Sequence, residues 1–186
     1  VSFGPVAGIS DDGSTITFQW EFSVNGGVGW ATVSNGGGYS GATTNTLTVD
    51  DDFAKNSYQF RCKLETSTSV APSYTNAATL TVFRTISVTT QPVNSQPIAP
   101  AAGTFTATGS TLDSATIAYQ WQKSENGDGV NYSDISGANT TTYNTGSTTY
   151  DDSYGDYYRC KLSATGASDV FSNAARLFVQ RTINVT

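Results

Sequence analysis

The residues best suited to chemistry in this 186-residue chain are two clusters of aspartates. Asp50, Asp51 and Asp52 are consecutive, and Asp151 is followed by Asp152. Carboxylate oxygens suit Ca²⁺, but a calcium site needs about six or more oxygens, and neither cluster has the spacing of an EF-hand loop. Both clusters come shortly before an expected strand, where Asp commonly hydrogen-bonds the backbone of a turn. We interpret both as turn residues, with Ca²⁺ binding as the alternative, and expect neither a metal nor a cofactor.

The chain contains no histidine, the commonest general base in enzymes. Serine and cysteine nucleophiles normally need such a base beside them. Two neighbouring carboxylates could still hydrolyse a glycoside, but the sequence around the aspartates gives no sign of a pocket. We therefore expect a protein that is not an enzyme.

The balance of charge argues against a nucleic-acid partner. Lys and Arg number 9 against 15 Asp and Glu, which gives a formal net charge of −6. A protein that binds nucleic acid needs a basic stripe to meet the phosphates. No apolar run approaches the roughly 20 residues that cross a bilayer. The sequence predicts neither nucleic-acid binding nor a membrane span.

Two aromatic residues in expected loops are candidates for binding at the surface. Trp30 and Tyr132 occupy equivalent positions in the repeat described next. Exposed aromatic rings stack on sugars and anchor interfaces. The alternative is that both rings cover a sheet edge or the end of a core. We keep Trp30 and Tyr132 as possible surface-binding residues, with a cell-surface glycan as the possible ligand.

An internal repeat organises the chain and sets where these residues must lie. Four segments recur in the same order: FQW (18–20) as YQW (119–121), FRCKL (60–64) as YRCKL (158–162), NAATLTV (76–82) as NAARLFV (173–179), and RTISVT (84–89) as RTINVT (181–186). The offset is 101 residues at the tryptophan (121 minus 20) and 97 at the arginine (181 minus 84). The repeat predicts one domain over residues 1–83 and another over residues 84–180. Residues 181–186 then begin a further repeat or a linker.

The repeat is out of phase with the ends of the sequence. Phe3 matches Phe105, so the first domain lacks its first strand, which is the counterpart of residues 86–102. Residues 182–186 begin that stretch again. We interpret the sequence as a window from a longer tandem array. The alternative is that the terminal segment completes a neighbour's unit by strand donation.

Alternating hydrophobicity predicts β-strands. Apolar residues occupy every second position over residues 58–64 and again over residues 158–164, with polar residues between them. This period of two is typical of a strand with one buried and one wet face, and no stretch has helical spacing. We expect an antiparallel β-sandwich in each domain. The expected core residues are Trp20, Phe60, Cys62, Trp121, Tyr158 and Cys160.

The two cysteines occupy equivalent positions in different domains. A bond between Cys62 and Cys160 would need Cα atoms within about 7 Å of each other, which two cores in series cannot supply. We expect both to be free, buried thiols. Folding without disulfides fits a reducing cytosol, and it does not exclude secretion.

The order of these features resembles an immunoglobulin-like (Ig-like) domain. A tryptophan is followed by a Gly-rich hairpin, a Thr-rich strand, adjacent aspartates and an aromatic-Arg-Cys strand. Tyr158 stands two residues before Cys160, where that family often has its corner tyrosine, and Phe60 takes this place in the first domain. The family's partner cysteine is absent near residues 3–7 and 105–110. The resemblance implies an all-β fold of two tandem Ig-like antiparallel β-sandwich domains.

Residues 119–143 look like the Ig-like repeats of tailed-phage virion proteins and of bacterial surface adhesins. This resemblance implies a non-enzymatic structural or display module on a virion surface, either a decoration, a fibre or a tail-associated protein. Its partners would be neighbouring Ig-like repeats or virion proteins, with weak adhesion to cell-surface glycans. The alternatives are the stalk of an adhesin at the bacterial cell surface, or extracellular, and a filament subunit assembled by strand donation.

Overall fold

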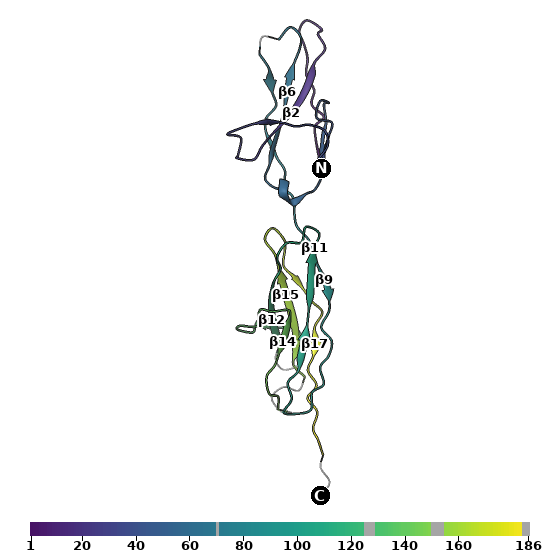
Figure 1. Ribbon diagram of the computed structural model, residues 1–186, viewed down its shortest axis with the longest axis vertical. Helices are drawn as coiled ribbons and strands as arrows, with labels where there is room; N and C mark the ends of the chain where they lie inside the picture. The colour runs from purple at the N-terminus through teal and green to yellow at the C-terminus, as the bar shows by residue number, and fades with distance from the viewer. Residues whose placement is uncertain (70, 125–128, 150–154, 184–186) are drawn as a thin grey trace. The chain divides into compact units, whose positions relative to one another are not determined.

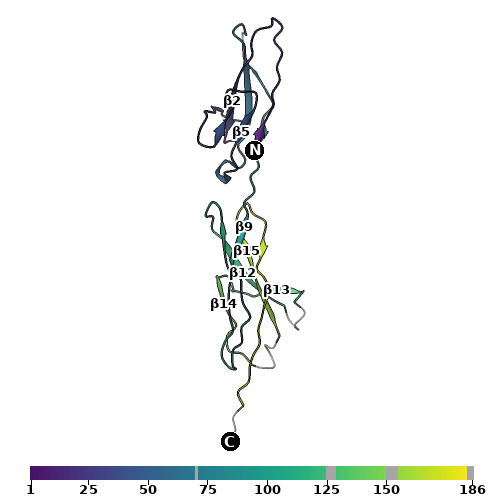
Figure 2. The same cartoon turned by 90° about the vertical axis from the view of Figure 1, so that its right-hand side faces the viewer.

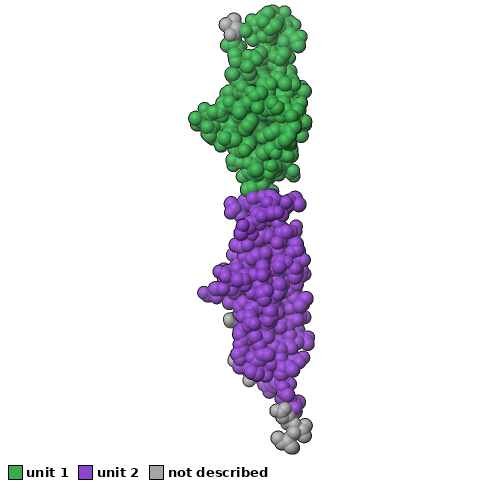
Figure 3. Space-filling model, viewed as in Figure 1, with its two compact units in different colours: residues 1–83 green, residues 84–186 purple. Residues whose placement is uncertain are grey.

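The computed structural model describes residues 1–69, 71–124, 129–149 and 155–183. The chain divides into two compact units, Val1–Phe83 and Arg84–Thr186 (Figure 3). The aspartates Asp151 and Asp152 lie outside the described residues. Within the described part, all regular structure is β-strand except one 3-10 turn, η1 (Phe53–Lys55).

Unit 1 contains two antiparallel sheets (Figure 1). The larger sheet runs in the order β3-β2-β6-β7, and β8 also pairs with β6. Its strands are β2 (Thr17–Ser23), β3 (Ala31–Thr32), β6 (Gln59–Glu65), β7 (Ser73–Tyr74) and β8 (Ala78–Thr79). The smaller sheet runs β1-β5-β4, from β1 (Ser2–Phe3), β5 (Leu47–Val49) and β4 (Tyr39–Ser40).

Unit 2 repeats the larger sheet in the order β13-β12-β15-β16, with β17 paired to β15. Its strands are β12 (Ala118–Ser124), β13 (Tyr132–Asp134), β15 (Tyr157–Ser163), β16 (Val170–Phe171) and β17 (Ala175–Arg176). Figure 2 labels β12, β13 and β15 of this sheet. The described residues of unit 2 form two further strand pairs: β9 (Ile86–Thr90) with β11 (Thr108–Thr111), and β10 (Thr104–Thr106) with β14 (Thr142–Asn144).

The inner faces of the sheets meet in one core per unit. Trp20 lies opposite Cys62 in the β2–β6 register, and Trp121 lies opposite Cys160 in the β12–β15 register. All four side chains are buried. Each core also takes residues from the second layer of strands, among them Leu47 and Val49 in unit 1 and Ile86 and Phe105 in unit 2. The predicted all-β fold of two tandem Ig-like sandwiches is confirmed.

The aromatic residue two positions before each cysteine also lies in the core. The Phe60 ring is 4.8 Å from the Phe3 ring, centroid to centroid, and the Tyr158 ring is 4.7 Å from the Phe105 ring. Phe60 and Tyr158 are both buried. Equivalent residues thus make equivalent ring contacts in the two units, tilted by 34° in unit 1 and stacked at 24° in unit 2. Each contact joins the larger sheet to the strand that carries Phe3 or Phe105.

The cysteines are free and buried, as expected. Burial raises the pKa of the Cys62 thiol, and it raises the pKa of the Cys160 thiol to about 11. Since the thiolate is the reactive form, both thiols are held in their unreactive form near neutral pH.

The consecutive aspartates of unit 1 lie at a turn. The Asp52 side chain caps η1 by accepting a hydrogen bond of 2.9 Å from the backbone N of Ala54, so the turn interpretation is confirmed for this residue. Asp50 forms an ion pair with Lys55. Lys55 is 8% exposed. Its Nζ lies 5.2 Å from the centroid of the Tyr39 ring and donates a hydrogen bond to the Asp50 carboxylate.

Two glycines at equivalent positions, Gly8 and Gly109, differ in how much room their surroundings leave for a side chain. A Cβ added at Gly109 would lie 2.5 Å from Leu162 Cδ2 and 3.0 Å from the backbone O of Ser87 in β9. A Cβ added at the equivalent Gly8 would lie 2.9 Å from Ile16 Cδ1 and from Leu64 Cδ2. Leu162 is fully buried, whereas the Ile16 and Leu64 side chains are only half-buried and have room to move.

We expect Gly109→Ala to lower the free energy of unfolding of unit 2 by about 2 kcal/mol, because overpacking against a fixed core typically costs this much. Gly8→Ala should cost unit 1 less than about 1 kcal/mol. Hydrogen exchange of β12 and of β2 in the two variants, at low protein concentration, measures the two effects separately. If both variants lost the same free energy of unfolding, the backbone of β9 would not be what excludes a side chain at Gly109.

Candidate functional site

The outer face of the larger sheet carries the same group of side chains in both units. Because residues alternate along a strand, the strand that directs Phe60 and Cys62 inward directs Arg61 outward. In unit 2 the same alternation directs Arg159 outward from β15. The neighbouring strands on either side then determine what each arginine contacts.

In unit 1, Arg61 lies between two aromatic rings. Its guanidinium carbon is 4.2 Å from the centroid of the Trp30 ring and 4.1 Å from that of Tyr74. Glu21, directly opposite Arg61 in the sheet, accepts a hydrogen bond of 2.8 Å from Arg61 Nε. Each guanidinium–ring contact is favourable because the ring face carries negative charge density. We call Trp30, Arg61 and Tyr74 the unit 1 triad.

In unit 2, Arg159 lies between Tyr132 and Phe171. The distances from the guanidinium carbon to the two ring centroids are 3.9 Å and 4.2 Å. Gln122 Oε1 accepts the hydrogen bond of 2.8 Å from Arg159 Nε. We call Tyr132, Arg159 and Phe171 the unit 2 triad. The two triads share their geometry, but Arg159 has a neutral amide where Arg61 has the Glu21 carboxylate.

The turn before β3 holds Trp30 in place. Asn25 Oδ1 accepts a hydrogen bond of 3.0 Å from the backbone N of Gly29, and Ser23 Oγ accepts one of 3.0 Å from that of Gly27. The Trp30 indole Nε1 donates to the carbonyl of Gly27 at 3.1 Å. The ring is therefore fixed by its own turn as well as by Arg61, which reduces the entropy that a ligand would have to remove.

One ring of each triad is well exposed to solvent. Tyr74 is 45% exposed and Phe171 is 43% exposed, whereas Trp30 and Tyr132 are half-buried. Each triad thus presents an aromatic face next to a planar cation. Such a surface can stack on the apolar face of a sugar ring and donate hydrogen bonds to its oxygens.

The sequence indicated Trp30 and Tyr132 as possible surface-binding residues. In the structure each ring contacts an arginine at an equivalent position, Arg61 or Arg159. Sequence reasoning missed Arg61, Arg159, Tyr74 and Phe171. A signal for them was present in the repeat: Tyr74 in SYTN aligns with Phe171 in VFSN, 97 residues later (171 minus 74). The predicted core residues, from Trp20 to Cys160, lie inside the sandwiches and form no part of the surface.

Neither a metal site nor a spanning helix is seen in the part of the chain that the structure describes. Over these residues, no three His, Cys, Asp or Glu side chains gather as metal ligands would. No helix among the described residues has the length and apolar character to cross a bilayer.

Similar proteins were found among family models and solved structures. The chain is similar to the four N-terminal Ig domains of Dscam1 isoform 6.9, at 17% identity and a TM-score of 0.49, over 89% of this chain and 38% of that one. The four N-terminal Ig domains of Dscam1 isoform 8.4 are 18% identical, with a TM-score of 0.48, over 97% of this chain and 41% of that one. The eight N-terminal Ig domains of Down Syndrome Cell Adhesion Molecule isoform 1.30.30 are 16% identical, with a TM-score of 0.46, over 89% of this chain and 22% of that one. The chain therefore spans well under half the length of these structures.

No curated protein matches the chain. One family model matches residues 89–181, which is half of the sequence. The chain therefore belongs to the family described as Domain of unknown function (DUF8696).

Proposed function

We propose that this chain is a non-enzymatic, surface-displayed Ig-like module that attaches weakly to glycans through its two triads. The observation that carries the proposal is the recurrence of one geometry: in both units an arginine lies between two aromatic rings, and one of the rings is well exposed. A single exposed ring and guanidinium bind a sugar weakly. Two such sites on one chain, multiplied by many copies on one surface, bind through avidity.

The proposed location is the surface of a phage virion, as a decoration, fibre or tail-associated protein, with neighbouring Ig-like repeats or virion proteins as partners. What supports it is the resemblance of residues 119–143 to virion repeats and the free thiols of Cys62 and Cys160, which need no oxidising compartment. Fractionation tests this location. Recovery of the protein with purified virions is the expected result, and recovery with the bacterial cell envelope would favour the adhesin stalk instead.

The double variant Tyr74→Ser, Phe171→Ser is expected to lose about tenfold or more in apparent affinity for glycans. Each substitution removes one exposed stacking face, which contributes about 1 kcal/mol, and avidity multiplies the two losses. The measurement is binding of the labelled chain, displayed in many copies on a bead, to a printed array of bacterial and animal glycans.

A matched control is Phe83→Ser, because Phe83 is a largely exposed aromatic residue outside both triads. It should leave binding unchanged. The proposal is wrong if the original chain binds no glycan on the array, or if Phe83→Ser weakens binding as much as the double variant does.

A further inference from the structure

The cations on the outer faces of the two larger sheets have different partners. In unit 1, Arg61 and Lys63 both lie on the outward side of β6. Glu21 Oε2 is 2.8 Å from Arg61 Nη2, and it also accepts the hydrogen bond from Arg61 Nε. Glu65 Oε2 is 2.9 Å from Lys63 Nζ. Each of these two cations therefore has a carboxylate directly beside it.

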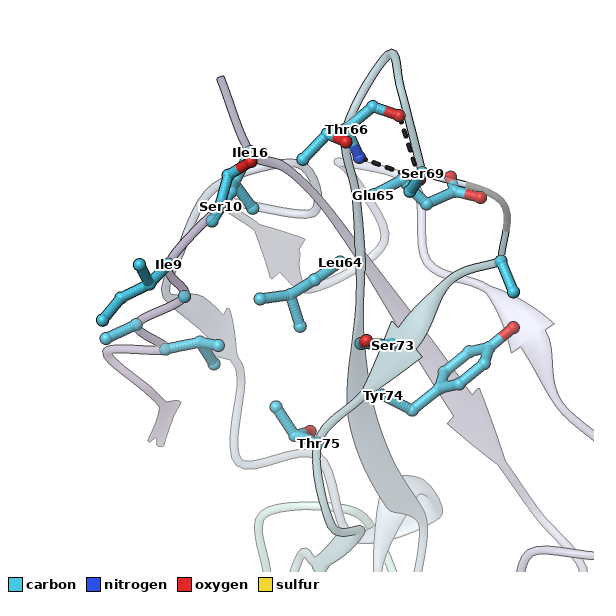
Figure 4. Close-up of a pocket in the computed structure, with 14 residues that line it drawn as sticks. Ile9, Ser10, Ile16, Leu64, Glu65, Thr66, Ser69, Ser73, Tyr74 and Thr75 are labelled. Atoms are coloured by element: carbon cyan, nitrogen blue, oxygen red, sulfur yellow. Dashed lines mark hydrogen bonds between the residues drawn. The ribbon is translucent and has the colours of Figure 1, made fainter. Parts of the chain in front are cut away.

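Glu65 shares its face of the sheet with the Tyr74 ring of the unit 1 triad. In the close-up of a pocket of unit 1, the Leu64 side chain is directed to one side of β6 (Figure 4). The Glu65 carboxylate and the Tyr74 ring are directed to the other side. This is the alternation of consecutive residues along a strand. A ligand stacked on Tyr74 would therefore lie on a face that also carries the carboxylates of Glu65 and Glu21.

The unit 2 triad has a neutral residue where unit 1 has Glu21. The repeat aligns Gln122 with Glu21, and Gln122 lies opposite Arg159 in the β12–β15 register. Gln122 Oε1 accepts the hydrogen bond from Arg159 Nε, and Gln122 Nε2 donates one of 2.7 Å to Asp134 Oδ1. Within the described part of the chain, the bond to Gln122 occupies one of the five N–H donors that a guanidinium carries. The remaining donors of Arg159 can therefore meet an anion.

The second cation on this face also has a neutral residue in place of an acidic partner. Lys161 follows Arg159 by two residues along β15, so alternation directs both to the same side. The repeat places Ser163 at the position from which Glu65 pairs with Lys63 in unit 1. Over the parts of the chain that the structure describes, no carboxylate forms an ion pair with Arg159 or Lys161. Two neighbouring positive charges thus remain on the outer face of unit 2.

Two aspartates lie at the edges of this face. Asp134 belongs to β13 and Asp169 directly precedes β16, and both are exposed. Asp134 accepts its hydrogen bond from the Gln122 amide, one residue away from the arginine. Water and salt screen exposed charges that are not in contact. These carboxylates therefore weaken the attraction of Arg159 and Lys161 for an anion less than the direct ion pairs of unit 1 weaken that of its cations.

We propose that the unit 2 triad selects sugars that carry an anionic group, a carboxylate or a sulfate, whereas the unit 1 triad takes neutral sugars. The Phe171 ring would stack on the apolar face of the sugar, and Arg159 would hold the anion through two parallel N–H···O bonds. Lys161, directly opposite Phe171 in the sheet, would add a second positive charge. In unit 1 the same anion would be repelled by Glu21. This inference rests on the proposed function, because it assigns a class of sugar to sites already proposed to bind glycans.

Three polysaccharides with one backbone test the role of the anion: dextran, which is neutral, carboxymethyl dextran and dextran sulfate. The chain, displayed in many copies on a bead, is titrated onto surfaces coated with each of them. We expect at least one of the charged dextrans to bind about tenfold more tightly than dextran, as one added charge-assisted hydrogen-bonded pair would allow. The preference should shrink in high salt. Whichever of the two charged dextrans binds more tightly identifies carboxylate or sulfate as the anion that fits.

Exchange of one side chain between the triads makes the test specific. Gln122→Glu gives Arg159 the carboxylate partner that Arg61 has, so the preference for a charged dextran should fall to about twofold or less, while dextran binding stays. Glu21→Gln removes the carboxylate from Arg61, so the preference should grow. The matched control is Ser110→Glu, which adds the same charge at an exposed residue of β11, in a different sheet of unit 2. This control should keep the preference of the original chain.

The outcomes separate this inference from the proposed function. A chain that binds glycans on the printed array but shows no preference among the three dextrans would leave the proposed function standing and overturn the inference. A preference that survives Gln122→Glu, or that Ser110→Glu abolishes equally, would also overturn it, because the anion would then be bound elsewhere. A chain that binds neither the array nor any dextran would overturn both.

Discussion

Trp121→Ala is expected to lower the free energy of unfolding of unit 2 by about 4 kcal/mol, because truncating a buried aromatic residue removes transfer energy and leaves a cavity. The Trp121 side chain is fully buried. Its ring lies 6.3 Å from that of Phe105 and 6.1 Å from that of Tyr143, centroid to centroid. Its indole Nε1 donates a hydrogen bond of 2.9 Å to the carbonyl of Thr140. Removing the donor leaves that carbonyl short of a partner as well.

The equivalent variant in unit 1 is Trp20→Ala, in which the lost hydrogen bond is the one of 2.9 Å to the carbonyl of Thr44. Urea unfolding followed by hydrogen exchange of β12 and β2 assigns each loss to its unit. Trp30→Ala, at a half-buried residue of the outer face, should cost less than about 1.5 kcal/mol. If Trp121→Ala weakened both units equally, the units would have to unfold as a single cooperative block.

Much of the fold was accessible from the sequence because one face of each central strand is buried. Alternation over residues 58–64 predicts a strand and its inner face, and a slip of one residue would reverse that face. The structure has β6 over Gln59–Glu65, with Cys62 opposite Trp20. Because residues 158–164 repeat this alternation, the same prediction applies to β15 and to Trp121. Fold class and core thus depended on local patterns, which a single sequence records well.

The repeat aligns the members of the two triads, but their contacts could not be predicted, because these depend on the order of strands in the sheet. Arg61 is 31 residues from Trp30 (61 minus 30) and 13 from Tyr74 (74 minus 61). The three meet only because β6 lies between β2 and β7. The burial of Lys55 is likewise not recorded in its sequence neighbours, because it depends on the Tyr39 ring and on Asp50, whose positions follow from the β4–β5 pairing.

The structure of residues 7–10 was accessible only in part. The repeat aligns these residues with residues 108–111, but it does not indicate whether each segment pairs with a neighbouring strand. In the structure, residues 7–10 form no strand, while the equivalent residues 108–111 form β11. Strand formation here depends on pairing with β9 more than on local propensity, which is the general behaviour of β-structure.

Native Cys160 is expected to react with a thiol reagent at pH 8 at least about 1000-fold more slowly than an exposed cysteine. Burial raises the pKa of its thiol from 9.0 to about 11, which alone lowers the thiolate fraction at pH 8 about 100-fold. The side chain is also fully buried, so the reagent reaches it only when unit 2 opens. A chain carrying Cys62→Ala isolates this reaction, and Cys160→Ala isolates that of Cys62.

The pH dependence of this reaction has a defined sign. The folded state holds the Cys160 proton more tightly than the unfolded state does, so the protonated thiol contributes its stability fully below about pH 9 and loses it as the pH rises toward 11. Unit 2 should therefore label faster and unfold more easily over that range. Trp121→Ala should speed Cys160 labelling by about 1000-fold, the equivalent of about 4 kcal/mol, and leave Cys62 unchanged. Rapid labelling of native Cys160 at pH 8 would contradict its burial, and equal acceleration at Cys62 would contradict the independence of the two cores.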